Sequence, residues 1–107
     1  FPQGMLVTVP LHFSQLAQGT TLDTLRQLYR DHYAGQKNIH ITDAPESGFL
    51  GSNNVVGTND LNIYVTGNEQ QAIVSAQFDN LGKGASGAAV QNFNILMGLD
   101  EDLGIIE

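Results

Sequence analysis

A hairpin is predicted by residues 61–78, whose sequence is LNIYVTGNEQQAIVSAQF. The runs 61–66 and 71–78 are typical of β-strands, and Gly67-Asn68 between them is the strongest turn signal in the chain. We therefore expect the two runs to pair as antiparallel strands, with the rest of the fold assembled around them.

Two further strands are predicted upstream of this hairpin. Residues 5–11 (MLVTVPL) form a short run rich in β-branched residues, and Pro10 places its end at a sheet edge or a bulge. Residues 38–42 (NIHIT) alternate strongly enough for a short strand with Ile39 and Ile41 on one face. The chain thus offers at least four strands to one sheet.

Two helices are predicted as well. The first is capped by Thr20 or Thr21 and runs to about Tyr33, and the second spans residues 86–97 and ends at Gly98. Their apolar stripes are Leu22, Leu25, Leu28 and Tyr29 in the first and Ala89, Val90, Phe93 and Leu96 or Met97 in the second. Because strands and helices do not alternate regularly, we predict an α+β domain: a mostly antiparallel or mixed sheet with about two main helices on one side.

Composition limits the function classes. The chain of 107 residues and 11.5 kDa has room for one domain, and its net charge of −7 with four basic side chains argues against binding nucleic acid. No window is apolar enough to span a membrane, and the absence of cysteine excludes disulfides and thiolate nucleophiles within this chain. We expect a cytoplasmic protein, and an opening of Phe1-Pro2 just before a strand indicates a fragment of a longer one.

A glycine-rich turn, Gly82-Lys83-Gly84-Ala85-Ser86-Gly87, matches the spacing of a dinucleotide-binding fingerprint. Too little chain follows it for a second parallel strand, so a Rossmann domain is excluded on length. Two interpretations stay open: free backbone N–H groups at a helix N-terminus beside Lys83 suit an anion or polar ligand, or the glycines merely allow close helix packing.

The remaining polar signals are weaker. Residues 51–54 (GSNN) lie in the long loop 43–54 and form either a ligand loop or, as the residue chemistry favours, an Asx-type turn. The histidines, His12, His32 and His40, lack the spacing of metal ligands, so no metal site is expected.

One long segment carries a family resemblance. Residues 78–98 (FDNLGKGASGAAVQNFNILMG) closely resemble the C-terminal signature of the N-acetyl-γ-glutamyl-phosphate reductases. Residues 50–53 (LGSN) are similar to the family's Gly-Ser-Asn motif, 21–33 to its LxxxYxxxY helix and 4–8 to a strand that follows its active-site histidine. Aspartate-semialdehyde dehydrogenase has a related segment but does not usually continue as residues 87–94 do, so it is the nearest alternative.

The resemblance implies the function. Members of this family are NADP-dependent enzymes of arginine biosynthesis that reduce N-acetyl-γ-glutamyl phosphate to the semialdehyde, with release of phosphate. Their fold implies a domain like the C-terminal domain of glyceraldehyde-3-phosphate dehydrogenase, so residues 1–107 would be one substrate-binding and dimerisation domain of a homo-oligomer. The family's catalytic cysteine and histidine lie upstream of Phe1, so we expect no catalytic residue here and an inactive fragment. A non-catalytic binding or dimerisation module is the alternative from another class.

The resemblance also implies site residues. Ser52 and Asn53 would bind the acetamido or carboxylate group of the substrate. The NADP of a cofactor domain absent from this chain would be approached by Asn80, Lys83, Gly84 and Gly87. Departures from the family pattern are Gln3 in place of a common arginine, Gly82 in place of an aliphatic residue and Ala88 in place of a glutamine.

Overall fold

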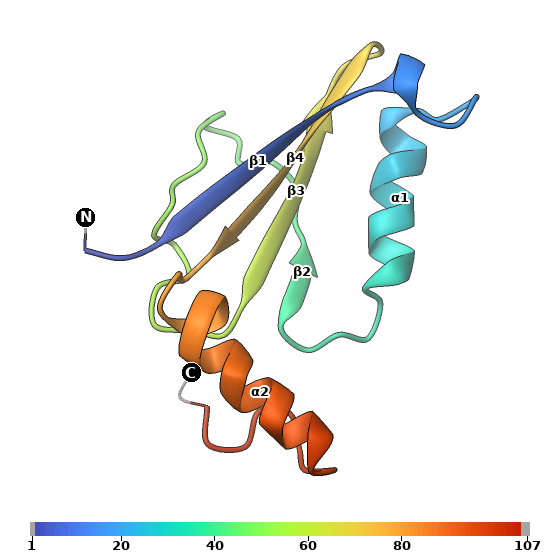
Figure 1. Ribbon diagram of the computed structural model, residues 1–107. Helices are drawn as coiled ribbons and strands as arrows, with labels where there is room; N and C mark the ends of the chain where they lie inside the picture. The colour runs from blue at the N-terminus through green and yellow to red at the C-terminus, as the bar shows by residue number, and fades with distance from the viewer. Residues whose placement is uncertain (1, 106–107) are drawn as a thin grey trace.

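A computed structural model describes residues 2–105 and contains one four-stranded sheet in the order β1-β4-β3-β2. The strands are β1 (Met5–His12), β2 (Ile39–Ile41), β3 (Leu61–Gly67) and β4 (Gln71–Phe78). The neighbours β1/β4 and β4/β3 are antiparallel, whereas β2 runs parallel to β3 (Figure 1). The predicted mixed sheet and the α+β class are confirmed.

The β3–β4 hairpin has the predicted turn. Asn68 Oδ1 accepts hydrogen bonds from the backbone N–H groups of Gln70 (2.9 Å) and Gln71 (3.0 Å). Gly67 has φ of +150°, and a Cβ there would lie 2.2 Å from the carbonyl oxygen of Gln71, so a side chain does not fit at this position. At the other side of β4, β1 forms the sheet edge, as Pro10 predicted.

Helix α1 (Leu22–His32) covers one face of the sheet. Its capping box is formed by Thr21 and Thr24, with Thr24 N donating to Thr21 Oγ1 at 3.2 Å. Leu25 packs with Ile63, Val65 and Ala72 in the buried core, and the partly buried apolar side chains around them include Leu22, Tyr29, Ile39 and Ile41. The predicted helix, its cap and the inward face of β2 are therefore confirmed.

The opposite face of the sheet is polar and lies under the long loop 42–60. Alternation along the strands turns Asn62, Tyr64 and Gln77 away from α1, and Tyr64 and Gln77 are buried there. The loop is drawn in green in Figure 1, on the other side of the sheet from α1.

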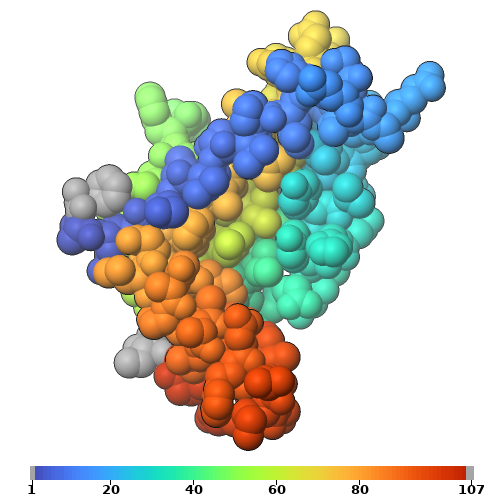
Figure 2. All heavy atoms as spheres, viewed as in Figure 1, coloured from blue at the N-terminus to red at the C-terminus, as the bar shows by residue number. Residues whose placement is uncertain are grey.

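Helix α2 (Gly87–Leu96) continues from one turn of π-helix, η2 (Gly82–Ser86), which the sequence did not predict. The sequence predicts both helices on one side of the sheet, but only α1 lies on a face. Helix α2 leaves the end of the sheet as a separate lobe (Figure 2). Its apolar residues are largely exposed, with Leu96 at 83%. A short 3₁₀ turn, η1 (Phe13–Gln15), completes the elements.

Candidate functional site

The end of β4 and the turn into η2 form the candidate site, and Asp79 lies at its centre. This carboxylate is almost fully buried and accepts hydrogen bonds from Gln3 Nε2 (2.8 Å), Gly57 N (2.8 Å) and Leu81 N (2.9 Å). Gln3 precedes β1, Gly57 belongs to the long loop and Leu81 leads into η2. One side chain thus joins three segments that are far apart in the sequence.

Hydrogen bonding decides the charge of Asp79. The backbone N–H of Gly57 and then that of Leu81 lower the pKa of the carboxyl below its ordinary value of 3.8, against the opposing effect of burial. Smaller contributions in the same direction come from the N–H of Gly82 and from Gln3. Asp79 is therefore ionised at neutral pH.

This carboxylate lies where one of the two interpretations of the glycine-rich turn expects an anion or polar ligand. The N–H groups at the start of η2 point to Asp79, which precedes the turn, so the chain supplies its own anion there. The turn is wound as a π-helix because Gly84 N donates to Asp79 O (2.9 Å) and Ser86 N to Leu81 O (3.3 Å).

Asn80 and the Ser52–Asn53 loop come together at Gly4. Asn80 Oδ1 accepts a hydrogen bond from Gly4 N at 2.7 Å, and a Cβ on Gly4 would lie 2.3 Å from Ser52 O. The Asn80 amide nitrogen donates to no group within residues 2–105, so the bond from Gly4 to Oδ1 orients the amide and leaves its nitrogen available. The structure thus places one predicted cofactor residue and both predicted substrate residues around the same stretch of backbone.

Lys83, Gly84 and Gly87 make contacts inside the chain. Lys83 Nζ donates to Gln91 Oε1 on α2 at 2.7 Å. A Cβ on Gly84 would lie 3.0 Å from the Phe78 ring, and one on Gly87 would lie 2.4 Å from Asn59 Oδ1. Close packing, the second interpretation left open by the sequence, accounts for both glycines: Gly84 lies against the end of β4, and Gly87 lies against Asn59 and the Gly82 backbone.

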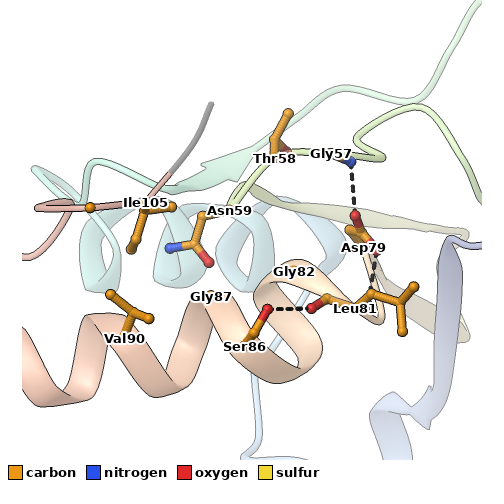
Figure 3. Close-up of a pocket in the computed structure, with 11 residues that line it drawn as sticks. Gly57, Thr58, Asn59, Asp79, Leu81, Gly82, Ser86, Gly87, Val90 and Ile105 are labelled. Carbon is orange, nitrogen blue, oxygen red and sulfur yellow. Dashed lines mark hydrogen bonds between the residues drawn. The ribbon is translucent and has the colours of Figure 1, made fainter.

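A cavity of about 320 Å³ opens beside this turn. Figure 3 shows Asn59 pointing into it, with Val90 and Ile105 opposite and Gly87 nearby. Asn59 is 1% exposed; its amide nitrogen donates to Gln91 Oε1 (3.2 Å), whereas its Oδ1 has no partner in the part of the chain that the structure describes.

Sequence reasoning missed Asp79, Gln77 and Asn59. An aspartate just before a glycine-rich turn is a signal for local capping of backbone N–H groups, and it could have identified Asp79. Gln77 lies inside a run that is otherwise typical of a strand, and Asn59 in a polar loop, so neither carried a signal of burial.

Among residues 2–105, no three His, Asp or Glu side chains gather as metal ligands would. His12 and His32 are exposed, and His40 lies 3.4 Å from Asp60 Oδ1. No helix in this part of the chain is both long and apolar enough to cross a bilayer.

Comparison with known proteins adds three findings. Residues 1–80 match the family described as "Semialdehyde dehydrogenase, dimerisation domain". The N-acetyl-gamma-glutamyl-phosphate reductase 2 of Nostoc sp. is 40% identical over 98% of the chain and 35% of its own length. The N-acetyl-gamma-glutamyl-phosphate reductase of Rhizobium meliloti is 42% identical over 91% of the chain and 33% of its own length. The chain therefore spans about a third of the curated relatives that it matches.

Proposed function

The chain belongs to the semialdehyde dehydrogenase dimerisation-domain family, and from this we propose that it is the substrate-binding and dimerisation part of an NADP-dependent N-acetyl-γ-glutamyl-phosphate reductase. The observation that carries the proposal is about 40% identity to two enzymes of that name over nearly the whole chain. The reaction proposed is the conversion of N-acetyl-γ-glutamyl phosphate to N-acetylglutamate semialdehyde and phosphate, in arginine biosynthesis.

The nucleophile of this reaction must come from outside these residues, because the sequence holds no cysteine. We propose that a cysteine thiolate upstream attacks the acyl phosphate carbon, phosphate leaves as the C–O bond breaks, and a thioester remains. NADPH, when bound, would supply the hydride that reduces this thioester, and the semialdehyde is released as the C–S bond breaks and the cysteine thiolate leaves. An upstream histidine serves as acid and base in these steps.

The residues of this chain would bind and orient the reactants. The Ser52 hydroxyl and the Asn53 amide offer donors and acceptors to the acetamido or carboxylate group of the substrate. The Asn80 amide nitrogen fits a place beside the nicotinamide carboxamide, because Gly4 orients it and leaves it free to donate. Lys83 would add positive potential near the acyl phosphate. Gly84 would keep η2 close to β4, and Gly87 would keep the start of α2 close to Asn59.

Assembly belongs to the same proposal. The family is described as a dimerisation domain, and Met5, Val7 and Val9 on the edge strand β1 expose apolar side chains beyond the part of the sheet that α1 covers. We propose a homo-oligomer that buries such surface. A cytoplasmic location stays a prediction.

A chimera tests the reductase assignment. The corresponding third of the Rhizobium meliloti enzyme is replaced by residues 1–107, and phosphate-dependent reduction of NADP⁺ is measured with N-acetylglutamate semialdehyde. We expect turnover within about tenfold of the host enzyme, a difference of about 1.4 kcal/mol in activation free energy.

The control for the chimera is the host enzyme rejoined to its own segment by the same cloning route. Aspartate semialdehyde is assayed in parallel, since the nearest alternative enzyme would use it. A folded chimera that turns over neither compound, or that prefers aspartate semialdehyde, would contradict the proposal.

A further inference from the structure

Gln77 is a completely buried amide in the middle of a sheet face. It lies on β4 opposite Asn62 and faces away from α1, with 0% of its surface exposed. Its Oε1 accepts hydrogen bonds from Asn62 Nδ2 (3.0 Å) and Tyr64 Oη (3.3 Å). Both acceptor positions of the amide oxygen are therefore used within the sheet, which fixes the direction of the amide nitrogen.

The fixed amide nitrogen points into the long loop and donates to the backbone oxygen of Gly51. Residues 51–54 are Gly, Ser, Asn and Asn, so they carry no apolar side chain that burial could anchor. Hydrogen bonds must hold this part of the loop on the sheet, and the bond from Gln77 is the one made by a fully buried side chain.

A second contact holds the loop from the side. Gly4 has φ of +114°, and its backbone lies so close to Ser52 that a Cβ would be 2.3 Å from Ser52 O. Its N–H is bound to Asn80 at 2.7 Å. The loop is thus held between Gln77 on the sheet and the Gly4 backbone, and its height above the sheet depends on both.

We propose that Gln77 is a positioning residue that sets the Ser52–Asn53 loop at the height where it meets substrate. The role of the loop in binding substrate rests on the proposed function, whereas the attachment of the loop by Gln77 does not. Gln77 acts through Gly51 and touches no reactant. Loss of its amide leaves the carbonyl of Gly51 without its donor and frees Ser52 and Asn53 to move.

Two variants remove the attachment in different ways. Gln77→Met keeps the length of the side chain and deletes its amide. Gln77→Asn keeps an amide but is one methylene shorter, so it cannot stay beside Asn62 and Tyr64 and also reach Gly51. The matched control is Thr8→Val, which deletes the side-chain hydrogen bond between the Thr8 and Ser75 hydroxyl groups (3.2 Å) that joins β1 and β4.

Hydrogen exchange of the intact reductase chain that carries residues 1–107 gives the first readout. In both Gln77 variants we expect the loop N–H of Val56, which donates to Asn53 O (3.4 Å), to exchange about tenfold faster, while the N–H groups of the β3–β4 hairpin change little. Thr8→Val should leave the loop unchanged. Unchanged loop exchange, or equal acceleration in the loop and the hairpin, would overturn the proposal.

Steady-state kinetics of the same proteins give the second readout. We expect KM for the acyl phosphate to rise about tenfold with kcat and KM for NADPH nearly unchanged, because only substrate binding is loosened. Faster loop exchange with an unchanged KM for the acyl phosphate would overturn the positioning role. If the wild-type chain shows no reductase activity at all, the proposed function fails, and the exchange comparison still decides whether Gln77 holds the loop.

Discussion

The half of the molecule built from the sheet and α1 is held by apolar burial, whereas the half built from η2, α2 and the following turn is held by hydrogen bonds. In the first half, Ile63 and Val65 are buried against Leu25. In the second, the buried Asn94 donates to the backbone oxygens of Glu101 (3.0 Å) and Leu103 (2.9 Å).

The difference shows which half of the molecule is stabilised by its own residues. Apolar burial within the sheet half supplies its own stabilisation. The apolar residues of α2 have no such cover among the described residues, with Phe93 and Ile95 both 58% exposed. The candidate site lies at the junction of the two halves, which is where a further domain of the proposed reductase would complete it.

The largest expected effect comes from a matched pair of isoleucines. Ile63→Ala in the sheet half should lower the free energy of unfolding by about 2–5 kcal/mol, because it leaves a cavity in the core. Ile95→Ala on the exposed side of α2 should change it by less than about 0.5 kcal/mol. Urea unfolding of both variants of this chain measures the difference. Equal losses would show that α2 is as well packed as the sheet.

A smaller effect is expected at the junction, from Gly87→Ala. The new Cβ would lie 2.4 Å from Asn59 Oδ1 and 2.8 Å from Gly82 O, so η2 and the loop must separate, at a cost of about 1–3 kcal/mol. Gly19→Ala does not serve as a control, because its φ of +87° would strain an alanine. The control is Ala88→Gly, at the next position on α2, which reports the change in helix propensity alone. Hydrogen exchange should show faster exchange in η2 and α2 than in the hairpin. A loss spread evenly over the chain would contradict the division into halves.

The smallest effect depends on pH and concerns Asp79. Hydrogen bonds, chiefly from Gly57 N, lower the pKa of Asp79 in the folded state, so its stabilisation is complete above the ordinary value of 3.8 and is lost as pH falls through the lower folded pKa. The difference in unfolding free energy between wild type and Asp79→Asn should therefore be constant near neutral pH and shrink below about 3.8. Urea midpoints measured over this range test the prediction, and the other carboxyl groups cancel in the comparison. A difference that does not depend on pH would contradict it.

Local sequence determined the elements of the sheet half. The hairpin follows from Gly67-Asn68 between two strand-like runs, and α1 follows from a threonine cap and a stripe of leucines. Such signals act over a few residues, where backbone preference and side-chain period are set by chemistry that the sequence displays. The sequence also pointed to the family, because residues 78–98 resemble the C-terminal signature of the N-acetyl-γ-glutamyl-phosphate reductases.

Only the tertiary structure decided how the site is assembled. Gln3 reaches Asp79 and Gly4 reaches Asn80 across 76 positions of the chain, and Gln77 reaches Gly51 across 26. The sequence proposed Ser52, Asn53 and Asn80 as separate site residues, and their roles stay predictions. The pairing of β1 with β4 brings Gly4 to Asn80, and the bond from Gln77 to Gly51 holds Ser52 and Asn53 beside Gly4. Hydrogen bonds between polar residues that are distant in the sequence produce no periodic pattern in it. Each partner is an ordinary loop or strand residue until the fold brings the two together.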